Sequence, residues 1–243
     1  MAFFDTPAKF AGLKREGREA GIRNCLWIFP TVPDICGELR ALRDGYHKPY
    51  WIDSVSVLDE TCFAFASADV MSGLAANPNV CGALFAGHGV KGSCARALPH
   101  ARIMPMISPK PSEDETILFG IILDGLAANT TRTRVNIGFS SLRAGIVMDP
   151  DLPDSGLPAA VDGLIAWLEK NGACVPRSER DSPESALKLA ATGAQIIIST
   201  AAEHNAIPCP APVMRISPED VAETQEKTLE GLIERFFLTL SAR

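Results

Sequence analysis

Residues 25–44, CLWIFPTVPDICGELRALRD, decide the fold. The first part of this stretch, 25–32, is apolar almost without interruption, which predicts a β-strand that is buried on both faces of a sheet. The second part, 33–44, has the spacing of a helix that buries one face, and Asp34 is the expected N-cap. A buried strand that leads into a helix is typical of a parallel sheet with helical crossovers.

The same alternation continues along the chain. Further β-rich runs occur at 54–60, 80–87, 102–108, 134–141, 144–149, 194–200 and 213–217. Helical patterns lie between them at 65–76, 113–129, 156–171, 182–193 and 218–240. Ser67 and Ser182 are expected N-caps, and Gly172 and Gly193 are expected helix ends. The sequence therefore predicts an α/β fold, a doubly wound and mostly parallel sheet or sheets with helices on both faces.

One polar, proline-containing segment, SPKPSEDET at 108–116, interrupts this pattern. It predicts a division into two α/β halves, residues 1–110 and 111–243. A single sheet with an exposed crossover loop at this point is the alternative.

Composition narrows the class of protein. The 243 residues are 47% hydrophobic and 21% charged, with a net charge of −6, which argues against a nucleic-acid partner but not against an anionic small substrate. The sequence has no apolar run of membrane-spanning length, and its N-terminus has no signal-peptide pattern. The seven scattered cysteines form no CxxC pair and read as reduced thiols. We therefore expect a cytoplasmic protein without a membrane partner.

Polar residues follow several of the predicted strands, and parallel sheets place ligand sites at these carboxyl ends. Asp59 and Glu60, which follow one strand, suggest a cation site or a general base. His88 lies between two glycines after another strand, and a tight turn explains it equally well. His204, beside a glutamate after a later strand, suits a metal ligand or a proton-transfer group, and a solvated loop is the alternative. The sequence carries no Walker loop, nucleophile elbow, H-E-x-x-H or G-x-G-x-x-G motif.

A longer motif is more specific. The stretch FAGLKREGREAGIRNCLWIFPTV (10–32) resembles the start of the catalytic region of the altronate/galactarate dehydratase family, F-x-G-[YF]-x-R-x-[DE]-G-R-x-G-[VI]-R-N, an apolar strand and P-T-V. A second stretch, LAANPNVCGALFAGHG (74–89), is similar to that family's L-x-x-x-x-N-[FV]-x-[GA]-x-L-x-x-G-L-G segment. Residues 155–179 and 190–217 resemble shortened versions of two later family segments.

The resemblance implies a metal-dependent hydro-lyase that dehydrates a sugar acid. Such chemistry needs a base for the proton α to the carboxylate and a Lewis acid for the enediolate. The resemblance points to Arg23, Asn24 and Thr200 as substrate-binding residues, although Arg23 would also suit a buried arginine that ties strands together. Together with the strand-end positions, it suggests His88, Glu60 and Cys62 as catalytic residues. The family pattern has neither His88 nor His204, but their positions after two of the strands suggest that they and Asp59 hold a divalent iron, zinc or manganese ion.

The sequence departs from the family pattern at the expected metal site. The family's G-L-G-C-E reads Gly87-His88-Gly89-Val90-Lys91, so valine and lysine replace a thiolate and a carboxylate. The histidine of T-H-x-x-G-C is missing, although Cys62 matches its cysteine. The leading interpretation is a hydro-lyase that acts on a small hydroxy-carboxylate. A catalytically silent paralogue that binds a sugar acid or serves an active enzyme as a partner subunit is the first alternative, and a sulfo-lyase acting on a sulfonated hydroxy acid is the second. We also expect a homo-oligomer.

Overall fold

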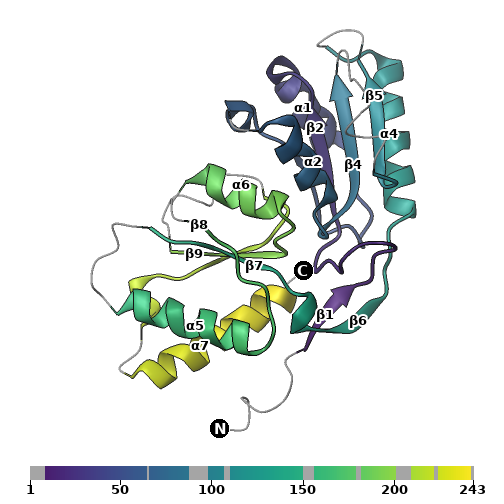
Figure 1. Cartoon of the computed structure of the whole chain (residues 1–243). Helices are drawn as coiled ribbons and strands as arrows, with labels where there is room; N and C mark the ends of the chain where they lie inside the picture. Colours follow the sequence, from purple (N-terminus) through teal and green to yellow (C-terminus); the bar gives the residue numbers. More distant parts are fainter. Residues whose placement is uncertain are drawn as a thin grey trace.

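Two parallel sheets and one antiparallel strand pair make up the fold (Figure 1). The computed structural model describes residues 9–64, 66–87, 98–106, 110–149, 156–178, 182–200, 209–221 and 224–241. Each parallel sheet has four strands, and helices cover both of its faces. The α/β prediction is therefore confirmed.

The first unit, residues 9–128, contains the sheet with the order β3-β2-β4-β5. Its elements are β1 (Lys9–Leu13), β2 (Cys25–Pro30), the 3-10 helix η1 (Pro33–Ile35), α1 (Cys36–Gly45), β3 (Ser54–Val57), the 3-10 helix η2 (Glu60–Ala64), α2 (Ala68–Ala76), β4 (Val80–Gly87), β5 (Ala101–Pro105) and α4 (Glu113–Ala128). Side chains alternate across the sheet. Trp27 and Phe29 of β2 pack on the α2 side, whereas Leu26 and Ile28 pack on the side of α1 and α4.

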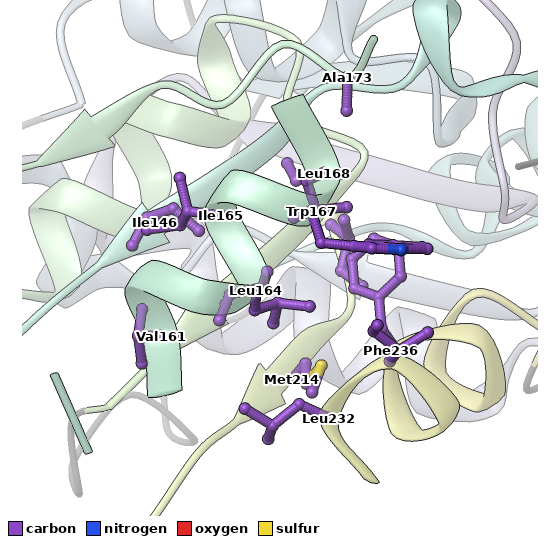
Figure 2. Packing of buried hydrophobic residues seen from close by; sticks show 14 of the residues in the cluster. Ile146, Val161, Leu164, Ile165, Trp167, Leu168, Ala173, Met214, Leu232 and Phe236 are labelled. Carbon is purple, nitrogen blue, oxygen red and sulfur yellow. The ribbon is translucent and has the colours of Figure 1, made fainter. Parts of the chain in front are cut away.

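The second unit, residues 134–241, contains the sheet with the order β10-β9-β7-β8. Its elements are β6 (Arg134–Gly138), the 3-10 helix η3 (Phe139–Ser141), β7 (Ala144–Val147), α5 (Leu157–Lys170), β8 (Arg177–Ser178), α6 (Pro183–Ala191), β9 (Ile196–Ser199), β10 (Val213–Arg215), the 3-10 helix η5 (Pro218–Asp220) and α7 (Gln225–Ser241). Helices α5 and α7 cover one face of this sheet, where Leu164, Trp167 and Phe236 meet Ile146 and Met214 (Figure 2). Helix α6 covers the opposite face.

The two units repeat one plan. In each unit, a short strand precedes a sheet whose strands lie in the order second, first, third, fourth along the chain. The helix between the second and third strands, α2 in one unit and α6 in the other, packs against its counterpart. The preceding strands β1 and β6 also pair with each other, in antiparallel orientation. Like elements therefore meet across an approximate two-fold axis.

Two buried amides join the units beside this axis. Asn79 comes directly before β4, and Gln195 comes directly before β9. The side-chain oxygen of Asn79 accepts from the backbone N–H of Ile22 at 2.8 Å, and its amide nitrogen donates to Gln195 O at 2.8 Å. Gln195 makes the equivalent pair of bonds from the second unit, because its Oε1 accepts from Arg143 N at 2.7 Å and its Nε2 donates to Ala20 O in the first unit. The amino edges of the two sheets are thereby fastened together.

Local structure corrects some expectations. Asp34 is not an N-cap, because Pro33 starts η1 after Val32 and this short helix runs directly into α1. Ser67 and Ser182 do cap α2 and α6. The strands β1 and β8 were not expected from the sequence, and the run at 134–141 contributes an antiparallel strand.

Helix α4 lies beyond the expected boundary at residue 110 and packs on the first sheet. The division into 1–110 and 111–243 stays a prediction. Within the described ranges, none of the helices combines the length and apolar character that a membrane crossing requires. The cytoplasmic location also stays a prediction.

Candidate functional site at the carboxyl edge of the first sheet

The order of strands in the first sheet marks one point as a ligand site. The crossovers from β2 and from β4 leave in opposite directions, and open α/β sheets bind ligands at the carboxyl ends of such a pair of strands. Thr31 follows β2 here, and its backbone N–H donates to Ala86 O of β4 at 2.9 Å.

Gly87 ends β4 with φ +135°, a conformation that other residues rarely adopt. A Cβ at Gly87 would collide with the hydroxyl oxygen of Thr31 and with Ile35. The backbone of β4 therefore approaches the end of β2 closely. Sequence reasoning did not select Thr31, although its place in P-T-V at a strand end is a usable signal.

Glu60, Asp59 and Cys62 lie at the same edge, after β3, but their surroundings differ. Glu60 is exposed. The carboxylate of Asp59 accepts from Thr61 N at 3.0 Å and from Arg40 Nη2 at 3.1 Å. The backbone bond from Thr61, followed by its hydroxyl bond and the charge of Arg40, lowers the pKa of Asp59 despite partial burial. Asp59 therefore fixes the turn into η2 and holds the Arg40 guanidinium at this edge.

Cys62 is fully buried against the α2 face of the sheet. Burial raises the pKa of its thiol, because the low-dielectric interior disfavours the thiolate. As placed here, Cys62 is a protonated core residue. Its catalytic role stays a prediction that would require the site to open.

Arg23 and Asn24 lie at the opposite edge, immediately before β2. The six residues of β2 place them about 20 Å from the carboxyl edge. The backbone N–H of Asn24 donates to the Asp53 carboxylate at 2.6 Å, and its side-chain amide donates to Thr131 O at 3.0 Å. The structure therefore does not bring Arg23 and Asn24 together with Glu60 and Cys62 in the shared cleft expected from the sequence.

The arginines of the 12–24 motif fasten the same amino edge. Arg15 is buried and donates to Pro78 O at 3.1 Å and to Arg23 O at 2.6 Å. Arg18 donates to Val80 O at 3.2 Å, and burial lowers its pKa to about 10. A side chain at Gly21 would collide with Pro78 O. These contacts give Arg15, Arg18 and Gly21 of the motif a structural role, which is to hold the backbone at the amino edge.

His100 adjoins Arg18 at this edge. Its Nε2 lies 3.0 Å from Arg18 Nη1 and 2.8 Å from Ala75 O. Burial, more than the neighbouring arginine charges, lowers the pKa of His100 to about 4, so the ring is neutral near pH 7. Because His100 lies away from the carboxyl ends of the strands, we assign it a structural role, in which it links Arg18 to the end of α2.

An open hollow of about 270 Å³ also lies on the amino side, between the ends of α2 and α6. Its lining includes Arg18, Glu19 and Arg143. Arg143 Nη1 donates to Thr192 O at 2.7 Å, so this guanidinium caps the carboxyl end of α6. The hollow is lined by groups that fasten the units, and it lies away from the carboxyl edge.

Thr200 belongs to the second sheet. It follows β9, where its N–H donates to Val147 O at 3.2 Å and its hydroxyl accepts from Asp149 N at 2.9 Å. This is the crossover point of the second sheet, equivalent to that of Thr31 in the first. The predicted substrate-binding role of Thr200 stays a prediction.

His88 and His204, the predicted nitrogen ligands, lie outside the described residues. Among the residues that the structure does describe, no group of three or more His, Cys, Asp or Glu side chains is arranged to hold a metal ion. The metal site therefore stays a prediction.

Comparison with known families supports the sequence motif. Residues 12–102 match the family described as D-galactarate dehydratase/Altronate hydrolase, second domain. The family resemblance is confirmed for this segment. The dehydratase-type segment runs from Gly12 of β1 into β5 and contains the crossover point between β2 and β4. No curated protein matches the chain. The resemblances at 155–179 and 190–217 lie beyond the match and stay predictions.

Proposed function

We propose that this protein is a hydro-lyase that acts on a small hydroxy-carboxylate of the sugar-acid class. One observation carries the proposal: the segment matched to the dehydratase family forms β2, β3, β4 and the start of β5, and so includes the ligand-type crossover point of the first sheet. The family name suggests the class of reaction, and the strand order suggests that the active site lies at the crossover point between β2 and β4.

The proposed reaction is a β-elimination. A base removes the proton on the carbon next to the carboxylate, hydroxide leaves the following carbon, and the resulting enol becomes a 2-oxo-3-deoxy acid. The products are this acid and one water molecule, so no redox partner is needed. We assign the base to Glu60, which is exposed at the carboxyl edge and follows β3, the strand on the other side of β2 from β4.

We assign the substrate carboxylate to Arg40 rather than to Arg23. Arg40 extends from α1 to the carboxyl edge, where its salt bridge with Asp59 at 3.1 Å orients the guanidinium. A guanidinium has five N–H donors in a planar fork, so one carboxylate partner leaves donors for a second. Arg23 lies at the amino edge and would bind substrate only at a different site.

A divalent iron, zinc or manganese ion is implied by the family and remains part of the proposal. The described residues at this edge do not fit such an ion by themselves, because Asp59 is engaged by Arg40 and Thr61 and the Cys62 thiol is buried and protonated. No step is therefore assigned to a metal. We propose a cytoplasmic setting, in keeping with the reduced cysteines expected from the sequence.

A catalytically silent paralogue is the second candidate. It is favoured by Val90 and Lys91, which stand where the family has a cysteine and a glutamate. Such a protein would bind a sugar acid, or assist an active partner subunit, without turning the acid over.

The test is an assay of the full chain on a panel of sugar acids and one sulfonated hydroxy acid. Each substrate is supplied with Fe²⁺, Mn²⁺ or Zn²⁺ and without metal, and 2-oxo acid and sulfite are measured. Glu60→Gln should lower kcat about 10²–10⁴-fold, the range for loss of a general base. Glu230→Gln, an exposed glutamate on α7, is the matched control and should leave kcat unchanged.

Three outcomes separate the candidates. Sulfite release in place of dehydration identifies the sulfo-lyase. Turnover that survives in Glu60→Gln contradicts the assignment of the base. No turnover under any condition, with sugar-acid binding detected by calorimetry, identifies the silent paralogue.

A further inference from the structure

The outer face of α4 is unusually apolar for a surface helix. Helix α4 covers the side of the first sheet that faces away from the second unit (Figure 1). Its inner residues, among them Phe119 and Leu123, are buried. On the outside, Ile117 is 56% exposed, Leu118 41% and Ile121 62%. Clustered exposed aliphatic residues of this kind mark interaction surfaces more often than isolated ones do.

The equivalent helix of the second unit provides a comparison. Helix α7 follows the fourth strand of its sheet as α4 does, and it packs on the corresponding face. Its exposed residues include Glu226, Lys227, Glu230 and Glu234, with Leu238 as an isolated apolar residue at 63% exposure. The same position in the fold is therefore compatible with a charged surface. The aliphatic face of α4 is not required by its place in the unit.

Charge is distributed unevenly along the α4 surface. Glu113 and Asp114 are exposed in its first turn. At its other end, Trp51 donates its indole N–H to Ala127 O at 3.1 Å, and the guanidinium of Arg132 lies 3.7 Å from the centre of the Trp51 ring. Exposed Lys48 belongs to the same 46–51 segment. Asp124, which accepts from the Tyr46 hydroxyl at 2.8 Å, is also exposed, between the aliphatic residues and Lys48 and Arg132. The surface is thus acidic at one end and mainly aliphatic in the middle, and at the other end its two cations outnumber the single carboxylate of Asp124.

We propose that this face joins two copies of the chain, with the two α4 helices antiparallel about a two-fold axis near Ile121. Antiparallel packing places the acidic end of each helix beside the basic end of its partner, whereas parallel packing would place like charges together. About this axis, Ile117 of each copy lies over Gly125 of the other. Gly125 is exposed and has open space where a Cβ would be, so it provides a hollow for the isoleucine.

The test is the mass of the full chain in solution, measured by sedimentation velocity over a range of concentrations. The wild type should dimerise, and Ile121→Glu should raise the dimer Kd at least tenfold by placing two carboxylates at the axis. Leu238→Glu is the matched control, because Leu238 is equally exposed on the equivalent helix, and it should leave the Kd unchanged. A wild type that is monomeric throughout, or an Ile121→Glu protein that dimerises as tightly as the wild type, would overturn the proposal.

A charge exchange tests the antiparallel arrangement independently of any loss of folding. Glu113→Lys with Asp114→Lys should weaken the dimer, because both ends become basic. Adding Lys48→Glu and Arg132→Glu to the same chain should restore it, because unlike ends again meet. Failure of the fourfold variant to recover, while its thermal unfolding resembles that of the twofold variant, would contradict the antiparallel packing.

Discussion

The first and second units follow one plan, but they differ at their carboxyl edges and on their outer helices. At the crossover point of the first sheet, Gly87 lets β4 approach Thr31. At the same point of the second sheet, the Thr200 hydroxyl is bonded to the backbone of Asp149. The outer helix exposes three neighbouring aliphatic residues in the first unit, whereas the exposed residues of its counterpart in the second unit are mainly charged.

What the units share is concentrated at their amino edges. Asn79 and Gln195 occupy equivalent positions and exchange equivalent hydrogen bonds. Arg15 and Arg143 each donate to a carbonyl just after the helix that lies on the axis, at Pro78 and Thr192. The comparison teaches that the architecture is fixed at one edge of each sheet, which leaves the other edge to differ.

The largest loss of stability is expected at the buried amides Asn79 and Gln195, which join the two units. Asn79→Ala removes the acceptor for Ile22 N–H and Arg23 N–H and the donor to Gln195 O, so the free energy of unfolding should fall by about 3 kcal/mol. Gln195→Ala, at the equivalent position, should cost about 2 kcal/mol. Urea denaturation of both variants measures these losses.

Asn171→Ala is the control for the joint, because this amide bonds only within the end of α5, to Trp167 O. It should cost less than about 1 kcal/mol. If Asn79→Ala lowers the free energy of unfolding no more than Asn171→Ala does, Asn79 does not join the units in the way proposed.

A smaller effect is expected on the pH dependence of stability, because His100 in the first unit is partly buried. The pKa of His100 in the folded first unit is about 4, below its ordinary value of 6.5, so between these values the unfolded chain binds a proton that the folded chain does not. Stability should therefore fall as the pH decreases from about 6.5 to 4, by about 1–2 kcal/mol after allowance for partial exposure.

His100→Gln should remove this contribution, measured as the difference in unfolding free energy between pH 7 and pH 4.5 for wild type and variant. Equal pH dependence in the two proteins would show that His100 is not the titrating group. No histidine lies beside Arg143 in the described part of the second unit.

The smallest loss of stability is expected at the N-caps of α2 and α6, the two helices that meet at the approximate two-fold axis. Ser67 accepts from Val70 N at the start of α2, and Ser182 accepts from Ser185 N at the start of α6. Replacing either serine by alanine should cost about 1 kcal/mol, since each loses one N-cap bond. Thermal unfolding of the two single variants should give matching shifts, and a shift in one variant alone would indicate that the axial helices are held differently.

The sequence predicts much of the fold because its strands are strongly marked. The runs at 25–32 and 80–87 are buried on both faces, and their apolar character requires no knowledge of their neighbours. The strand β1 contains Lys9 and forms only because β6 pairs with it, and β8 is two residues long. Such strands depend on distant partners that local pattern does not reveal.

The candidate site is less predictable for a related reason. A motif such as 12–24 shows which residues belong together, but not whether they serve the amino or the carboxyl edge. Arg23 and Asn24 belong to the motif and lie at the amino edge. Arg40 belongs to no motif, yet its salt bridge with Asp59 holds it at the carboxyl edge. Whether an arginine faces ligand or backbone is decided by the direction of the strand beside it.

The contact between α2 and α6 has a consequence for motion. The backbone passes so close at Gly73 that a methyl group there would strike Ala191 O, and the antiparallel β1–β6 pair lies at the same junction. Such a seam leaves no slack for hinge bending. We expect the two units to move as one body, without the hinge closure by which many two-lobed proteins enclose their ligands.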